Sequence, residues 1–209
     1  MKALKYILLV FLAAPMLASC EKETEGVSRV TAYATFKMEG SDFMFVQSGA
    51  TFTDPGVSAL EGETELTIET SGAVNTAAPG VYVLRYAAKN SDGFSASVQR
   101  TVVVVSSIPT TDLSGTYQIE HATRENKITI TKNEGLVGYY HATDSWWQAR
   151  AIPLDFVDMG DGTITILQGS SAYGGHHGTG EILPDGKIKF VVTLVDQGNL
   201  VNPQTYYPL

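Results

Sequence analysis

Cysteine is almost absent from this chain, because Cys20 is the one cysteine among 209 residues. Internal disulfides and thiolate metal sites are therefore excluded, and stability must come from hydrophobic burial. Basic residues are also in the minority, with 14 Lys and Arg against 22 Asp and Glu and a formal net charge of −8. Such a surface repels phosphate backbones, so we do not expect nucleic acid as a partner.

The sequence also lacks the motifs of the common enzyme classes. It has no Gly-x-Ser-x-Gly elbow, no His-Glu-x-x-His and no phosphate-cradling glycine loop followed by Lys-Ser or Lys-Thr. The sequence does not exclude a pair of carboxylates that hydrolyses glycosides, since it does not give the distance between two carboxylates. We therefore predict that the protein is not an enzyme and uses no cofactor.

Sustained helical periodicity is missing after residue 20. Val, Ile, Thr, Tyr and Phe recur there in short alternating runs, and Gly, Asp, Asn and Pro separate the runs. The segment 127–131 places two isoleucines on one face, and 187–195 does the same with four apolar residues. Turns at 91–93, 160–162 and 184–186 each supply a glycine between apolar runs, which is typical of hairpins. The pattern predicts an all-β protein.

The N-terminal segment 1–19 has the layout of a secretory signal peptide. Lys2 and Lys5 give a positive start, an apolar stretch runs from Tyr6 to Leu17, and small residues precede Cys20. The apolar stretch is shorter than the ~20 residues that a membrane-spanning helix needs. We expect it to be cleaved rather than to stay as a transmembrane anchor.

The end of this segment, Leu17-Ala18-Ser19-Cys20, resembles the lipobox of bacterial lipoproteins. The resemblance implies cleavage before Cys20 and acylation of its sulfur, whereas the alternative is an ordinary signal peptide with a chance cysteine. Each buried CH₂ of an acyl chain contributes about 0.8 kcal/mol, so several chains would hold the protein on a membrane. Cys20 is thus predicted to be a lipid anchor, with residues 20–26 as a tether.

The acidic run after the cysteine, Cys20-Glu21-Lys22-Glu23-Thr24-Glu25, resembles the export signal of surface lipoproteins in the Bacteroides group. The resemblance implies an outer-membrane lipoprotein that faces the cell exterior. A plain solvated tether would have the same composition.

The remaining chain divides into two predicted domains, 27–107 and 112–209, joined by a polar linker at 108–111. Before the linker, the run Thr101-Val102-Val103-Val104-Val105 is typical of a buried terminal strand.

Three segments of the first domain, 48–59, 75–97 and 100–105, carry a family resemblance. SGATFTDPGVSA, NTAAPGVYVLRYAAKNSDGFSAS and RTVVVV are similar to the bacterial immunoglobulin-like repeat found in an insecticidal crystal protein and in many surface proteins. The resemblance implies an immunoglobulin-like β-sandwich that acts as a spacer or an adhesive module. In agreement, Tyr82, Leu84 and Tyr86 would share one face of a strand.

In the second domain, residues 135–166 resemble the C-terminal β domain that follows such modules in Bacteroides-group lipoproteins. We predict an antiparallel β domain and leave open whether it is a sandwich or a barrel.

Two adjacent aromatic pairs, Tyr139-Tyr140 and Trp146-Trp147, stand out in this domain. Adjacent side chains of a strand point to opposite faces, so one ring of each pair should lie in the core and the other outside. An exposed ring with polar neighbours can stack on a sugar, whereas a buried one simply packs the core. The candidate ligand-binding residues are Tyr140, Trp146, Trp147, Asp144 and Gln148.

Two further groups of residues have side chains that can act as metal ligands. His176 and His177 lie in a glycine-rich segment, 170–180, which we expect to be a flexible loop. In such a loop both histidines could reach one metal ion, with Asp144 or Asp196 as a third ligand. Asp155, Asp158 and Asp161 hint at a calcium loop, but the pattern lacks the closing Glu of an EF-hand and favours a hairpin turn. We assign no metal site and leave open whether the two histidines bind metal.

Two functional hypotheses follow. In the first, a surface lipoprotein uses its C-terminal domain to bind glycan, a carbohydrate-binding role in capture and uptake. In the second, the protein is a cell-adhesion or structural module whose sheet edges or loops bind a surface protein.

Overall fold

The computed structural model describes residues 31–147 and 151–209. Within these ranges every regular element is a β-strand, apart from one 3-10 helix, η2 (Val195–Gln197), so the all-β prediction is confirmed. No helix in the described part of the chain is both long and apolar enough to cross a membrane.

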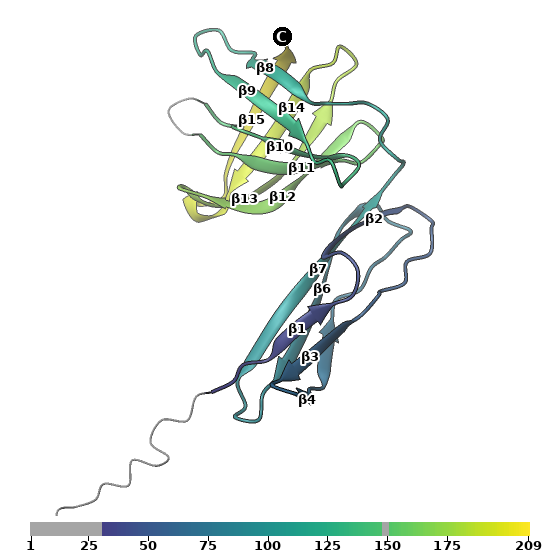
Figure 1. Ribbon diagram of the computed structural model, residues 1–209. Helices are drawn as coiled ribbons and strands as arrows, with labels where there is room; N and C mark the ends of the chain where they lie inside the picture. Colours follow the sequence, from purple (N-terminus) through teal and green to yellow (C-terminus); the bar gives the residue numbers. More distant parts are fainter. Residues whose placement is uncertain (1–30, 148–150) are drawn as a thin grey trace, which may run out of the picture. The chain divides into compact units, whose positions relative to one another are not determined.

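The first half of the fold contains two sheets, drawn from purple to teal in Figure 1. One sheet has the order β1-β3-β4 and the other β2-β7-β6-β5. The strands are β1 (Thr35–Met38), β2 (Phe43–Gln47), β3 (Val57–Glu61), β4 (Thr64–Glu65), β5 (Ile68–Ser71), β6 (Gly80–Lys89) and β7 (Ser95–Val105). β2 runs parallel to β7, and the other pairs are antiparallel.

Strand β6 shows how the sequence pattern sets the two faces of the larger sheet. Leu84 and Tyr86 are buried, whereas Val81, Val83 and Arg85 are exposed on the opposite face. The predicted inward face of this strand is therefore confirmed. The hairpin at 91–93 is also confirmed, because Gly93 takes a positive φ of 84° between β6 and β7.

A buried arginine holds the loops of this sandwich together. The Arg100 side chain is fully buried, and its Nη2 donates to the carbonyl oxygens of Glu39 (2.7 Å) and Gly56 (3.1 Å). Its Nε lies 3.5 Å from the Asp54 carboxylate, which also accepts a 2.7 Å hydrogen bond from the Tyr86 hydroxyl. Burial and the bond to Asp54 raise the pKa of Tyr86 to about 12. The arginine thus links β7 to the loop residues that follow β1 and precede β3.

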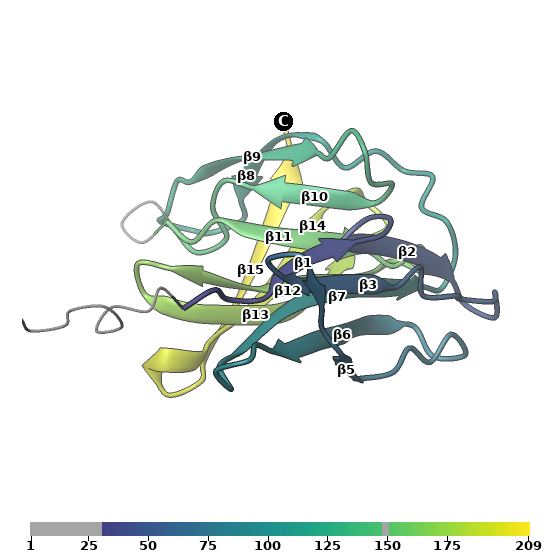
Figure 2. The same ribbon diagram turned by 60° about the horizontal axis from the view of Figure 1, so that its bottom comes forward.

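The second half is a closed eight-stranded barrel in which each strand pairs antiparallel with the next in sequence. Figure 2 shows β9, β10 and β11 side by side in this order. β15 returns to pair with β8, so the alternative left open by the sequence is settled in favour of a barrel. The strands are β8 (Gly115–Ile119), β9 (Lys127–Lys132), β10 (Tyr139–Ala142), β11 (Leu154–Asp158), β12 (Thr163–Ser171), β13 (Gly174–Ile182), β14 (Ile188–Leu194) and β15 (Leu200–Pro208).

Large side chains fill the interior of this barrel. β14 alternates strictly, with every second residue buried, as the sequence predicts. Phe156 lies between two other rings, with centroids 5.3 Å from Tyr140 and 5.1 Å from Phe190. The core also contains Leu113, Tyr117, Ile119, Ile128, Ile130, Ala142, Trp146, Ile152, Leu154, Ile164, Ile166, Ile188, Val192, Leu194 and Tyr206. Burial of such a set is the main driving force for folding this half.

The glycine-rich segment 170–180 is not a flexible loop, so that prediction was wrong. β12 ends at Ser171 and β13 begins at Gly174, which leaves a tight turn between two paired strands. A Cβ atom on Gly178 would collide with the carbonyl oxygen of Val191 on β14. The glycine therefore permits close strand packing, a use that composition alone does not distinguish from loop flexibility.

The outer face of β7 packs against the barrel. Val103 and Val105 are buried in a cluster with Val157 and Met159. Thr101–Val105 is thus apolar on both faces because residues on each side cover it, which explains the run of valines. Four partly buried side chains complete this junction cluster: Phe43, Phe45, Tyr139 and Leu167.

Hydrogen bonds fix the chain where it leaves β7. The backbone N–H groups of Ser106 and Ser107 both donate to the Met159 carbonyl, and Ser106 Oγ donates to Asp161 at 2.6 Å. Residues from Tyr33 onward form one compact unit. The domain division at 27–107, 108–111 and 112–209 stays a prediction about independent folding.

Candidate functional site

The adjacent aromatic pairs divide between core and surface as the strand pattern predicts. Tyr140 is buried in the barrel, whereas Tyr139 is partly exposed on the other face of β10. The Tyr140 hydroxyl donates to the Thr111 carbonyl (3.1 Å) and accepts from the Leu113 N–H (3.3 Å). Both the ring and the hydroxyl group of Tyr140 therefore contact other buried parts of the protein.

The two tryptophans divide in the same way. Trp146 belongs to the barrel core with 6% exposure, and Trp147 packs against that core from a partly exposed position. The Arg124 guanidinium lies 4.6 Å from the Trp147 ring centroid, a cation–π contact that covers one face. Of the four rings, Trp147 and Tyr139 are the ones with surface available to a ligand.

Asp144 performs a structural task in the loop after β10. Its Oδ2 accepts a 2.7 Å hydrogen bond from Asn126 Nδ2, and its Oδ1 accepts from the N–H groups of Trp146 and Ile152 at 2.9 Å. This buried carboxylate therefore stabilises both ends of the loop. Gln148 lies outside the described residues, and the ligand-binding role of all five candidates stays a prediction.

The neighbouring histidines point to opposite faces of β13. His176 is buried against Gly169 on β12, and His177 is exposed. Burial lowers the pKa of His176, and its Nδ1 has no hydrogen-bond partner within residues 31–147 and 151–209. Across residues 31–147 and 151–209, no three His, Cys, Asp or Glu side chains are grouped as metal ligands.

The aspartates at the end of β11 form a hairpin turn, as predicted. Asp158 accepts a hydrogen bond from the Gly160 N–H, and Asp161 accepts one from the Thr163 N–H. Gly160 and Gly162 both take positive φ values, of 78° and 85°.

A cleft of about 660 Å³ lies beside the junction cluster and was not predicted from the sequence. Its volume falls within the roughly 300–1,000 Å³ of small-molecule sites. It lies between the outer face of the β2-β7-β6 sheet and the outer wall of the barrel. The lining residues are Phe43, Val81, Val83, Arg85, Gln99, Thr101, Tyr139, Asp155, Thr165, Ile166, Leu167 and Gln168.

The sheet wall of the cleft changes from apolar to polar along the strands. Val83 on β6 pairs with Thr101 on β7, and the next outward pair is Arg85 with Gln99. Arg85 Nη1 lies 3.5 Å from Ser97 Oγ, one further outward position along β7. A ligand in the cleft would meet valine methyl groups at one end and hydrogen-bonding groups at the other.

The barrel wall is organised around Asp155. Its Oδ1 lies 2.8 Å from His141 Nδ1, and these residues are paired across β10 and β11. Burial, followed by the nearby Asp155 carboxylate, raises the pKa of Tyr139 to about 12, so this phenol is neutral. The Tyr139 ring meets Phe43 edge-on, with centroids 5.1 Å apart, where the two walls touch.

Sequence reasoning missed this cleft because its residues become neighbours only after the sheet and the barrel meet. One signal was available. The run Thr101–Val105 is apolar on both faces, which indicates that something covers the outer face of the sheet.

Comparison with known proteins agrees with the first half of the fold. Residues 36–104 match the family model described as bacterial surface protein, Ig-like domain, which covers about a third of the chain. The resemblance of this region to bacterial immunoglobulin-like domains is therefore confirmed. No curated protein matches the chain.

One solved structure similar to the chain is the crystal structure of the lipoprotein BT2262 from Bacteroides thetaiotaomicron. The two share 24% sequence identity, and the match covers 83% of this chain and 99% of that chain with a TM-score of 0.39.

Proposed function

We propose that this protein is a lipid-anchored, non-catalytic protein of the outer membrane that binds glycan at the cell surface for capture and uptake. Cys20 supports the anchor, because it follows an apolar segment in a lipobox-like context. The match of residues 36–104 to a bacterial surface domain supports display outside the cell.

The filled interior of the barrel carries the glycan part of the proposal. Core side chains such as Phe156 and Phe190 occupy the space in which other barrels hold a small ligand. Binding therefore falls to the outer surface, where partly exposed rings lie near hydrogen-bonding groups. Such a surface suits a long, solvated ligand such as a polysaccharide better than an enclosed metabolite.

The anchor is tested by Cys20→Ala, because Cys20 is the one site for the lipid. Cell fractionation should find the parent protein in the membrane and the variant either soluble or uncleaved. Membrane retention of a cleaved variant equal to that of the parent would contradict the lipid anchor.

The glycan role is tested with the mature protein on an array of neutral and acidic polysaccharides. We expect saturable binding to at least one polysaccharide and none to an unrelated lipoprotein domain used as the control. An array without binding would contradict the proposed function.

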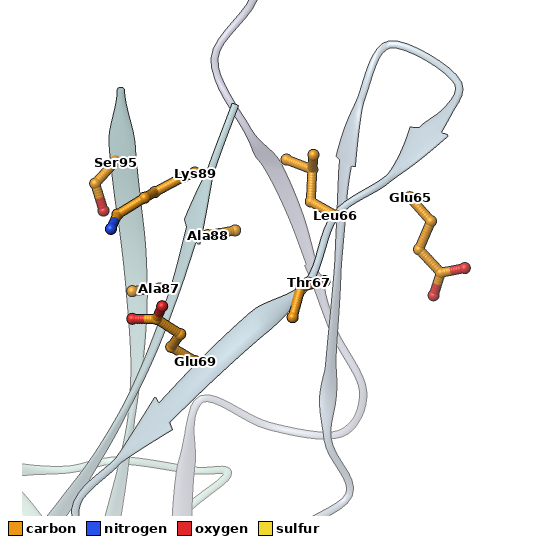
Figure 3. A pocket seen from close by; sticks show the side chains of 8 residues that line it. All are labelled: Glu65, Leu66, Thr67, Glu69, Ala87, Ala88, Lys89 and Ser95. Atoms are coloured by element: carbon orange, nitrogen blue, oxygen red, sulfur yellow. The ribbon is translucent and has the colours of Figure 1, made fainter. Parts of the chain in front are cut away.

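A second candidate function, adhesion to a surface protein, is favoured by the free edge of β5. Among the strands that the structure describes, β5 pairs with β6 alone, and a pocket of about 320 Å³ lies beside it. Figure 3 shows the pocket between Leu66 and Thr67 on one side and Ala88 and Lys89 on β6 on the other. An open strand edge can accept a strand from a partner. Thr67→Arg would fill the pocket. This candidate would be supported if cells adhere to a glycan-free surface and the variant loses this adhesion.

A further inference from the structure

We infer that the cleft between the β6-β7 face and the barrel wall binds a short segment of a neutral oligosaccharide. This inference rests on the proposed function, and it names both the site and the class of ligand. The site differs from the loop aromatics that the sequence suggested.

The sheet wall of the cleft presents side chains to a ligand. Val83, Arg85 and Gln99 lie on the outer face of the β6-β7 sheet, whereas the backbone N–H and C=O groups of paired strands lie in the plane of their sheet. A ligand on this face is therefore recognised by side chains.

The polar side chains of the cleft match neighbouring hydroxyl groups. The amides of Gln99 and Gln168 each offer one donor and one acceptor atom, the Arg85 guanidinium offers several N–H donors, and the Asp155 carboxylate offers two acceptor atoms. Two adjacent hydroxyls of a sugar ring present a matching pair of donors and acceptors. Arg85 and Asp155 carry opposite charges, and the whole chain is acidic, so a neutral ligand is favoured over a polyanion.

The apolar side chains supply the complementary surface. Val81 and Val83 are 36% and 42% exposed on the sheet face, so their methyl groups remain uncovered. A sugar ring has an apolar C–H face that can cover such groups while its hydroxyls reach the polar end. Binding would remove this apolar surface from water, which favours association.

The base of the cleft is held in place before any ligand arrives. The edge-on contact of Phe43 with Tyr139 joins the two walls, and the pairing of His141 with Asp155 fixes the carboxylate. A preorganised site loses less side-chain entropy on binding.

The test uses the full mature protein and a panel of short neutral oligosaccharides, with affinities measured by isothermal titration calorimetry. Val83→Arg fills the cleft from an exposed position, and we expect it to weaken binding by more than about tenfold. Its matched control is Val201→Arg, which changes an exposed valine on β15 and should bind like the parent.

A second pair of variants tests the hydrogen bonds. Gln168→Ala should weaken binding by up to about tenfold, the equivalent of one lost hydrogen bond, whereas Gln197→Ala in η2 should have no effect. Unchanged thermal midpoints would show that each variant is folded.

The outcomes separate the two proposals. Loss of binding in Val83→Arg and Gln168→Ala, with both controls intact, supports the cleft. Binding that survives both cleft variants overturns the cleft and leaves the proposed glycan function standing. A parent protein that binds no glycan, neutral or acidic, overturns both.

Discussion

The sandwich and the barrel of this protein bury their interiors in different ways. In residues 35–105, the inner faces include small residues such as Ala59 and Ala88, and a fully buried arginine joins the loops. In the barrel, aromatic and branched aliphatic side chains fill the centre, and the Tyr140-Phe156-Phe190 series of rings crosses it. The sandwich thus combines a smaller apolar core with a buried arginine network, whereas the centre of the barrel is filled by large apolar side chains.

The comparison also explains where a ligand can bind. A barrel filled by its own side chains has no room inside for a ligand, so a ligand must bind to its outer surface. The outer face of the sandwich sheet is half covered by the barrel at Val103 and half open at Val83. The cleft exists because the sandwich sheet and the barrel contact each other over only part of their surfaces.

The largest expected effect distinguishes the two tryptophans of the barrel. Trp146→Ala should destabilise the protein by roughly 3–5 kcal/mol, because it leaves a cavity in the core. Trp147→Ala should cost much less, because that ring is partly exposed and its contact with Arg124 is worth about 0.5–1 kcal/mol. Urea unfolding followed by circular dichroism measures both values, and equal losses would contradict the division of the pair.

The polar network of the sandwich is tested by Arg100→Met, which keeps an unbranched chain but removes the charge. Breaking a buried ion pair costs roughly 3–5 kcal/mol, and we expect the lower end because Asp54 is 29% exposed. Arg85→Met on the neighbouring strand is the matched control, since Arg85 is exposed, and it should change stability little. Equal midpoints for the two variants would show that the network adds nothing.

The junction cluster is tested by comparing the intact mature chain with the separate segments 27–107 and 112–209. Each segment should fold cooperatively, but separation exposes side chains such as Val103 and Val157 that are fully buried together. Fully burying a valine contributes about 1.5–3 kcal/mol, so both segments should unfold at lower temperature than the intact chain. Calorimetric midpoints identical to that of the intact chain would show that the junction contributes no stability.

The sequence predicted the individual strands and turns, but it did not predict that the C-terminal strands close into a barrel. The alternation in 188–194 identified an inward face, and the glycine turns identified the hairpins. Alternation alone does not show whether the last strand returns to the first, so the pairing of β15 with β8 was not predictable. The run Thr101–Val105 indicated that the outer face of the sheet is covered, but nothing in the sequence identified the barrel residues that form the other wall of the cleft.

One prediction failed for a reason of packing. The segment 170–180 has the composition of a loop, yet Gly178 is needed because the Val191 carbonyl lies too close for a side chain. The sequence also did not show that the oxygens of Asp144 accept hydrogen bonds from the buried N–H groups of its own loop, and its ligand-binding role stays a prediction.

The smallest expected effect is a pH dependence of stability from His176. Burial lowers its pKa in the folded state, with Asp155 acting in the opposite direction and His177 in the same direction. The unfolded chain therefore binds a proton near pH 6.5 that the folded chain does not, so stability should fall as the pH drops below that value. One proton changes stability by at most about 1.4 kcal/mol per pH unit. Between pH 7.5 and 5, His176→Gln should reduce the slope of the free energy of unfolding against pH by at most this amount. A slope equal to that of the parent would contradict the assignment.

The claim that the cleft, and not the loop tryptophan, contacts the ligand is tested most directly by NMR of the mature protein. The side-chain amide signals of Gln99 and Gln168 and the indole signal of Trp147 are followed during titration with the tightest-binding oligosaccharide. We predict that the two glutamine signals shift and saturate together with the calorimetric isotherm, while the indole signal stays in place. A shifting indole with unmoved glutamine amides would contradict the binding site.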